Sequence, residues 1–302
     1  MARRLLALSF LIAAVAAVVA IVAGTRGGHH EPEKADTRPV SKPAPKPVLG
    51  DRTVASPAPK SSLPPAPEQV SGAAAQRMPI PILMYHVIGV RPAAAVYPEL
   101  WVSPATFAAE MAALKRGGWW AITLRQAYDA WRQGGSLPRR PVIVSFDDGY
   151  LGDYTHARPV LSRLGWPGLL NLELRNVRAG DLTERQVRAL IRAGWEIDSH
   201  TIDHPDLTTV TDQQLKYELV GSRRQLQREF GVPADFFCYP AGRFDDHVIA
   251  AVRAAGYLGA TTEVEGYATP TNLYTLDRIR VRDTDTAATL LQRLRSLRSG
   301  TL

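Results

Sequence analysis

Two adjacent carboxylates follow a strand-like run near the middle of the chain. Residues 142–146 are apolar enough to form a buried strand, and Asp147, Asp148 and Gly149 come directly after it. Removing two carboxylates from water at the end of such a strand costs free energy unless a cation or hydrogen bonds compensate. Asp-Gly is also a common turn sequence. The pair therefore indicates either a turn or a polar site.

A pair of histidines follows a second strand-like run, residues 195–199. His200 and His204 are four positions apart, so a helical turn would direct both imidazoles to the same side. Two imidazoles and one carboxylate form a three-ligand set typical of catalytic zinc, which leaves one position open for water. Asp198 or Asp203 could orient an imidazole by accepting a hydrogen bond from it, and a solvated residue at a helix start is the alternative for Asp203. The alternative is two surface histidines.

A rigid turn follows a third strand-like run, residues 236–239. The turn Pro240-Ala241-Gly242 could direct the backbone N–H groups of its non-proline residues into a site, as stabilisation of an oxyanion requires. Cys238 lies among aromatic residues, and we interpret it as a core residue. It is the only cysteine in the chain, which excludes an intramolecular disulfide and a thiolate-based zinc finger.

The three motifs together resemble one protein family. Ser145-Phe-Asp-Asp-Gly149, His200-Thr-Ile-Asp-His-Pro205 and Tyr239-Pro-Ala-Gly242 occur in this order and are similar to the motifs of the polysaccharide deacetylases, the NodB-homology domain of carbohydrate esterase family 4. The resemblance covers Met78 to about Val281. It implies an α/β fold, a distorted (β/α)7 barrel. It also implies metal-dependent removal of N-acetyl groups from GlcNAc-containing polymers.

The resemblance also implies a role for each motif residue. Asp147 would be the general base, and Asp148, His200 and His204 would bind the metal. The backbone N–H of Ala241 would stabilise the oxyanion. The expected ion is Zn²⁺, although Co²⁺, Ni²⁺ or Fe²⁺ could occupy the same ligands. Three residues in or next to the motifs are expected to bind substrate: Tyr239, Pro240 and Tyr150. For Tyr150, a role in packing is the alternative.

Two of the departures from the family pattern concern catalytic groups. Cys238 stands where many relatives have an arginine that pairs with the base, and Arg278 or Arg280 could replace that arginine. The C-terminal catalytic histidine of the family is not evident at Leu290-Leu291-Gln292. His86, at the end of a strand-like run, is a possible general acid; a structural, hydrogen-bonded histidine is the alternative.

The elements that must position these residues alternate along the chain after Met78. Such alternation predicts a parallel sheet covered by helices, and a barrel in particular, with the motifs at the carboxyl ends of the strands. The expected strands are 80–85, 120–123, 142–146, 168–174, 195–199, 236–239, 258–262 and 278–281. Helix signals are Ser103-Pro104 with a stop at Gly117, a capping box of Thr183 and Gln186 with Gly194 after the last turn, and the runs 212–230 and 246–255.

The first 77 residues are expected to lie outside this barrel. Residues 5–24 carry no charge and would span roughly 30 Å as a helix, which is the thickness of a bilayer's hydrocarbon core. We expect residues 1–24 to be a transmembrane anchor or a cleaved signal peptide. Residues 25–77 would be a Pro-rich disordered linker, and 78–302 the catalytic domain. Arg3 and Arg4 favour a single-pass protein of the cell membrane with its catalytic domain outside the cytoplasm, secretion being the alternative.

Composition supports one folded domain and argues against a nucleic-acid partner. All six Trp and all ten Tyr lie after Met78. The net charge is +7, but residues 79–302 hold 26 basic and 24 acidic side chains, so the folded part is nearly neutral.

The expected partners follow from the family resemblance and from the N-terminal segment. We expect an N-acetylated polysaccharide as substrate and the membrane as a partner through the N-terminal helix. No protein partner can be inferred. The alternatives are an O-acetyl esterase on xylan or wall glycan and a catalytically degenerate glycan-binding module.

Overall fold

The structure is a computed structural model, and it describes residues 67–179 and 181–299. The expected anchor and most of the expected linker lie outside the described residues. Within the described ranges, no helix is both long and apolar enough to cross a bilayer.

Seven parallel strands close into a barrel. In sheet order they are β2 (Ile82–Tyr85), β12 (Leu276–Arg280), β11 (Gly259–Glu265), β10 (Phe236–Cys238), β9 (Glu196–Ser199), β8 (Leu169–Leu172) and β7 (Pro141–Asp148), and a β2–β7 pairing closes the ring. A further strand, β5 (Trp120–Ala121), pairs with the start of β7. All eight expected strands are therefore present, and the parallel seven-stranded barrel predicted from the sequence is confirmed.

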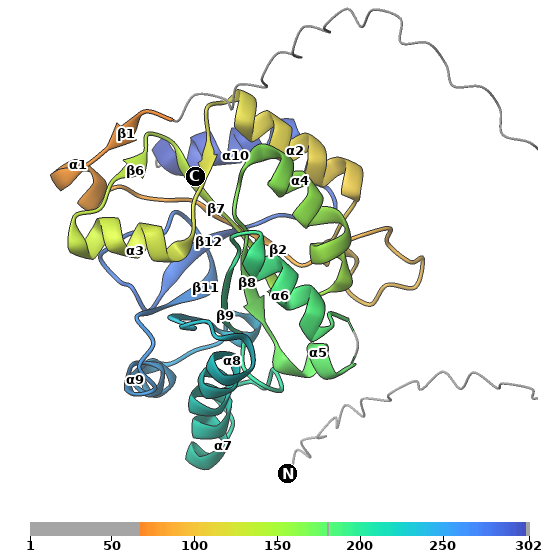
Figure 1. Cartoon of the computed structure of the whole chain (residues 1–302), viewed down its shortest axis with the longest axis vertical. Coiled ribbons are helices and arrows are strands. Elements are labelled where there is room, and N and C mark those ends of the chain that lie inside the picture. Colours follow the sequence, from red (N-terminus) through yellow and green to blue (C-terminus); the bar gives the residue numbers. More distant parts are fainter. Residues whose placement is uncertain (1–66, 180, 300–302) are drawn as a thin grey trace, which may run out of the picture. The chain divides into compact units, whose positions relative to one another are not determined.

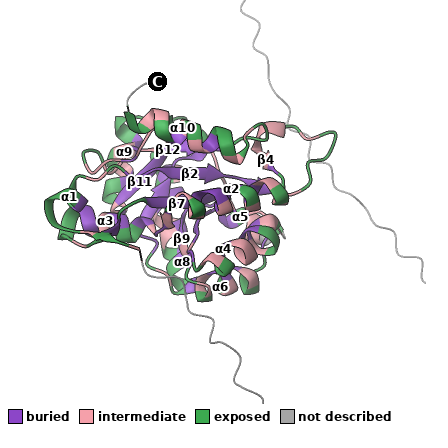
Figure 2. Cartoon of the chain, turned by 90° about the horizontal axis from the view of Figure 1, so that it is seen from above, coloured by how far each residue is buried: buried purple, intermediate pink, exposed green. Residues whose placement is uncertain are grey.

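Helices surround the strands (Figure 1), so that the buried residues gather in the centre (Figure 2). Ser103 accepts a hydrogen bond from the backbone of Thr106, and Thr183 and Gln186 form the expected capping box. The expected 212–230 helix is continuous but contains a π-helical turn, η3 (Tyr217–Gly221). The α-helices after residue 102 are α2 (Pro104–Arg116), α3 (Leu124–Gln133), α4 (Arg158–Leu164), α5 (Leu174–Ala179), α6 (Glu184–Arg192), α7 (Asp212–Lys216), α8 (Ser222–Phe230), α9 (Asp246–Ala254) and α10 (Ala287–Ser299).

The folded part includes residues before Met78. β1 (Gln69–Val70) pairs antiparallel with β6 (Leu137–Pro138), just before β7 begins, and α1 (Gly72–Gln76) buries Ala75. This segment lies in the span expected to be linker. It packs on the barrel because Val70, Ala75 and Met78 supply apolar contacts to a buried cluster. The small elements that complete the fold are β3 (Val87–Ile88) paired with β4 (Trp101–Val102), η1 (Pro98–Leu100), η2 (Asp153–Ala157) and η4 (Pro240–Gly242).

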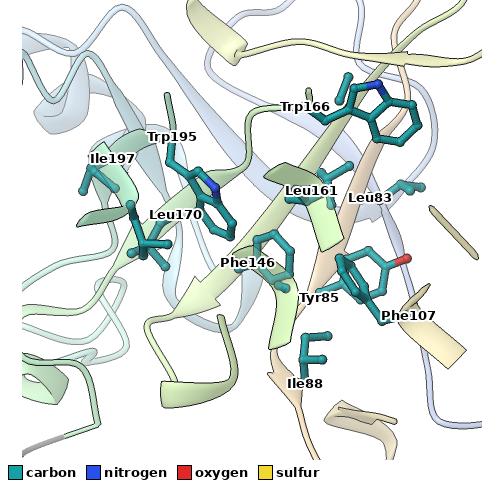
Figure 3. Close-up of a cluster of buried hydrophobic side chains, with 14 of the residues drawn as sticks. Leu83, Tyr85, Ile88, Phe107, Phe146, Leu161, Trp166, Leu170, Trp195 and Ile197 are labelled. Carbon is teal, nitrogen blue, oxygen red and sulfur yellow. The ribbon is translucent and has the colours of Figure 1, made fainter. Parts of the chain in front are cut away.

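Alternation along β7 sends its side chains to two different environments. Val142, Val144 and Phe146 join a cluster between the sheet and the outer helices. Phe146 stacks between Tyr85 and Trp195, with ring centroids 5.6 and 5.0 Å away (Figure 3). Ser145 and Asp147 point the opposite way because successive side chains of a strand face opposite sides. The outward aromatic cluster therefore fixes the inward direction of Asp147.

Candidate metal and catalytic site

The two adjacent aspartates lie in separate environments. Asp147 is 1% exposed, whereas Asp148 lines a pocket of about 450 Å³ at the carboxyl ends of the strands. Asp148 has a left-handed backbone, with φ 74°, and Gly149 follows with φ 93°. A Cβ at Gly149 would come within 2.6 Å of the Leu172 side chain. The chain therefore turns sharply after β7, which separates the two carboxyl groups.

Asp148, His200 and His204 converge in this pocket. Nε2 of His200 lies 3.4 Å from Oδ1 of Asp148, and Nε2 of His204 lies 3.8 Å from the same oxygen. The two Nε2 atoms are 3.1 Å apart. All the potential ligand atoms lie within 4.8 Å of one another. One carboxylate and two imidazoles in this arrangement can hold a divalent cation such as zinc.

The protein backbone orients the first imidazole. Nδ1 of His200 lies 2.9 Å from the carbonyl oxygen of Cys238. A carbonyl can only accept, so Nδ1 donates the hydrogen and Nε2 faces the metal site. The expected orienting acids do not contact either imidazole: Asp198 accepts from the N–H of Phe236, and Asp203 accepts from Arg175. That prediction was wrong, because a peptide carbonyl occupies the position expected for a carboxylate.

The two imidazoles meet through an irregular turn instead of the expected helical one. Thr201 and His204 both have left-handed backbones, with φ 71° and 53°. Oγ1 of Thr201 accepts a hydrogen bond from the N–H of His204 at 2.9 Å. The imidazole centroids are 4.7 Å apart and their planes differ by 73°. Such conformations cost about 1–3 kcal/mol each and persist only where surrounding contacts impose them.

The two imidazoles have opposite protonation tendencies. Burial lowers the pKa of His200, but the side chains of Cys238 and Asp148 outweigh it and raise the pKa well above its usual range. Burial and the neighbouring His200 lower the pKa of His204 to about 4. A proton on His200 thus partly neutralises Asp148, and a cation that binds here must displace this proton.

Asp147 is held by a buried arginine. Nη1 and Nη2 of Arg278 donate to its two oxygens at 2.7 and 2.8 Å, and Nδ2 of Asn171 donates to Oδ1 at 2.7 Å. Burial raises the pKa of Asp147, but the charge and hydrogen bonds of Arg278 outweigh it and bring this pKa below its usual range. Of the two arginines considered from the sequence, Arg278 makes this contact, while Arg280 pairs with Glu263.

His86 lies beside Asp147 because of the strand register. Tyr85 of β2 is opposite Phe146 of β7, so the next residue of each strand is also adjacent. Nε2 of His86 is 3.9 Å from Oδ2 of Asp147, and the side chain lines the pocket. Burial lowers the pKa of His86, although the two aspartates oppose this effect. The imidazole is therefore neutral at rest.

The turn after β10 contributes one residue to the pocket. Ala241 lines the pocket with a left-handed backbone, φ 50°, and Tyr150 lines it beside Asp148. Tyr239 and Pro240, expected to bind substrate, are instead buried. The hydroxyl of Tyr239 donates to the carbonyl of Tyr274. We therefore correct that expectation: these two residues support the turn from beneath.

Two residues of the site were not expected from the sequence. Asn171 binds Asp147 because the β7–β8 register places the two residues opposite each other. A polar residue within the apolar run 169–172 was the available signal. Glu173 follows β8 and lines the pocket, and burial and Asp148 raise its pKa to about 7. No sequence motif marks it.

Comparison with known proteins agrees with this geometry. Residues 134–260 match the model of the polysaccharide deacetylase family. A Bacillus subtilis protein named as a polysaccharide deacetylase, YxkH, is 31% identical over 204 residues, which cover 67% of this chain and 71% of that protein. The chain belongs to the polysaccharide deacetylase family. The membership and the hydrolase class predicted from the motifs are confirmed.

Other members of the family show how far the likeness extends. The structure of the Streptococcus pyogenes deacetylase PplD in complex with acetate aligns with a TM-score of 0.67 at 27% identity, covering 72% of this chain and 98% of that one. The poly-β-1,6-N-acetyl-D-glucosamine N-deacetylase of Escherichia coli K12 is 23% identical over 216 residues. Those residues span 57% of this chain and only 32% of the E. coli protein.

Proposed function

We propose that the protein removes N-acetyl groups from GlcNAc-type residues of an extracellular or cell-wall polysaccharide and releases acetate. The observation that carries the proposal is the convergence of Asp148, His200 and His204 in one pocket beside a second acid, Asp147, that is not part of the set. The N-acetylglucosamine polymers named for the E. coli and Staphylococcus aureus relatives support the substrate class.

Asp148, His200 and His204 would hold a divalent ion, and we propose Zn²⁺. When bound, such an ion polarises the acetamide carbonyl and lowers the pKa of water. Three protein ligands leave a coordination position for substrate or water. The Nδ1–H bond from His200 to the Cys238 carbonyl keeps the ligating nitrogen directed at the site.

Asp147 would act as the general base. Its lowered pKa keeps it ionised at neutral pH, and the paired Arg278 fixes its orientation. Oδ2 faces His86, so the proton taken from the attacking water can pass to the neutral imidazole. His86, acting as general acid, would then protonate the departing amine. The N–H of Ala241 would donate to the oxyanion that forms on the acetyl carbon.

We also propose that the apolar segment 5–24 anchors the protein in the cell membrane, with the catalytic domain outside the cytoplasm. The segment's length and the two arginines before it support this placement. Such a location would bring the enzyme to cell-wall polymer.

The direct test is acetate release by the full-length protein loaded with Zn²⁺. We expect acetate from N-acetylglucosamine oligomers, with an equal amount of new primary amine, and little acetate from acetylated xylan. Asp147→Asn should lower the rate by about 10²–10⁴-fold, the contribution of a general base. Asp203→Asn is the matched control, since Asp203 lies between His200 and His204 but its side chain pairs with Arg175 of α5 and does not touch the ligand set.

Other outcomes would replace the proposal with a different function. A preference for acetylated xylan would indicate an O-acetyl esterase. Retention of the glycan without acetate, unchanged by Asp147→Asn, would indicate a binding module. New reducing ends without acetate would indicate a glycosidase.

A further inference from the structure

A buried glutamate behind the metal ligands has no role in the proposed reaction. Glu218 is 0% exposed and belongs to the π-helical turn η3. Its Oε2 accepts hydrogen bonds from the N–H groups of Ile202 and Asp203 at 2.8 and 3.1 Å. Its Oε1 accepts from Nε2 of Gln214 at 3.0 Å. All three partners are donors, which suits a carboxylate because it can only accept.

The two backbone amides belong to the turn that separates the metal ligands His200 and His204. Thr201 and His204, which flank them, have the left-handed backbones described above. A turn of this kind is disfavoured by itself, and its buried N–H groups need acceptors. Glu218 supplies an acceptor to both amides. It therefore stabilises the conformation in which the two imidazoles meet.

The opposite side of the same turn is also fixed. The carbonyls of Thr201 and Ile202 accept from the N–H groups of Leu174 and Arg175 at 3.3 and 2.9 Å. The turn is thus held between the start of α5 and Glu218. Its carbonyls are bound on one side and its amides on the other.

The π-helical turn brings the helix close enough for this contact. At Gly221, one turn after Glu218, a Cβ would lie 3.1 Å from Cδ1 of Ile202. A Cβ there would require the Ile202 side chain to shift by a few tenths of an ångström. π-Helical turns interrupt a regular helix and occur frequently at functional sites. Here the turn places an acceptor and a close-packing glycine against the same residue.

We propose that Glu218 is a positioning residue of the metal centre. Through the backbone amides of Ile202 and Asp203 it holds the His200–His204 turn in its metal-binding conformation. Glu218 contacts no ligand atom, so its effect is on the affinity for the ion. The inference rests on the proposed metal-dependent function but is measured without turnover.

The test measures Zn²⁺ affinity by competition with a chromophoric chelator, using the full-length protein. Glu218→Ala should raise the Kd by about 10–100-fold, the usual effect of removing a group that orients a metal ligand. Glu218→Asp, one methylene shorter, should raise it by about tenfold because one oxygen cannot reach both amides. Glu218→Gln should stay within about threefold of the wild type, since its amide oxygen can accept the same two N–H groups. Hydrogen exchange of the metal-free protein should be faster around residues 200–204 in the Ala and Asp variants.

Glu110→Ala is the matched control. Glu110 is also 0% exposed and accepts a hydrogen bond, from the hydroxyl of Tyr85, but it lies on α2. The Glu110→Ala variant should have a lower Tm than the wild type and an unchanged Kd for Zn²⁺. Wild-type Kd and exchange in Glu218→Asp and Glu218→Ala would overturn the inference, as would an equal loss of affinity in the control. If Glu218→Ala fails to fold, the Kd values for Zn²⁺ of Glu218→Asp and Glu218→Gln still test the inference. If the wild type binds Zn²⁺ but releases no acetate, the proposed function fails while the role of Glu218 stands.

Discussion

Replacing Arg278 by methionine should destabilise the protein through the charge left behind. The Arg278 side chain is completely buried. It donates two hydrogen bonds to Asp147 and a third, from Nε, to the carbonyl of Thr262 at 2.7 Å. Its removal leaves the Asp147 carboxylate buried without a cation, and breaking a buried pair in this way costs about 3–5 kcal/mol. We expect a loss of this size in the free energy of unfolding at pH 7.

The double variant Asp147→Asn/Arg278→Met separates this explanation from a simple packing defect. It removes both charges, so it should recover about 2–4 kcal/mol of what the single variant loses. The assay is urea denaturation followed by tryptophan fluorescence, with a chelator present so that bound metal contributes nothing. Arg280→Met is the control. Its guanidinium pairs with Glu263 at a partly exposed position, so it should cost at most about 1 kcal/mol.

The pH dependence of the stability gives an independent check that the Arg278–Asp147 pair stabilises the fold. Arg278 lowers the pKa of Asp147 in the folded protein, so the pair stabilises the fold above about pH 4, the usual carboxylate pKa, and loses this effect as the pH falls further. The difference in stability between wild type and Arg278→Met should therefore shrink in acid. A double variant no more stable than Arg278→Met, or a difference that grows in acid, would refute the reasoning.

Three further outcomes follow from the structure, two from the site and one from a buried glutamate on α2. His200→Ala should lose the metal while Asp147→Asn retains it, as measured by elemental analysis of dialysed protein. The affinity for Zn²⁺ should increase with pH, and binding should release a proton, because the pKa of His200 is raised; titration calorimetry in buffers of different ionisation enthalpy measures this, and a pH-independent Kd would contradict it. Burial raises the pKa of Glu110 from its usual 4.5 to about 7, so stability is lost as the pH rises through this interval. Glu110→Gln should then be more stable than the wild type above pH 7, by at most about 3 kcal/mol, and equally stable below pH 4.5 in urea denaturation.

Local signals were sufficient to predict the strands and the helix ends. The run 142–146 reads as a buried strand by itself, and Ser103 with Pro104 begins a helix whatever surrounds it. The family motifs added the carboxyl-end placement of Asp148, His200 and His204, which the structure brings together. These features depend on residues close together in the sequence, so the sequence alone contains them.

Features that depend on register and on distant contacts could not be predicted in the same way. Arg278 and Arg280 are two positions apart on β12 and therefore face the same side of the strand. Only the three-dimensional arrangement shows that Arg278 is the one that reaches Asp147. The four-residue spacing of His200 and His204 suggested a helical turn. The irregular turn that forms instead is held by Glu218, which binds the intervening amides, and nothing nearby in the sequence reveals this contact. Tyr239 was expected to bind substrate, but its ring belongs to a buried cluster beneath the turn.

The first described residues join the barrel far from its chemistry. Pro67 lines a hollow with Trp120 and Gly194, residues at or just before the amino ends of strands, and β1 pairs just before β7 begins. The catalytic pocket opens at the carboxyl ends. The point where the N-terminal segment joins the barrel and the opening of the pocket therefore lie at opposite ends of the strands. If this segment anchors the protein as we propose, its length would set how far from the membrane the pocket can lie, without changing the residues of the pocket.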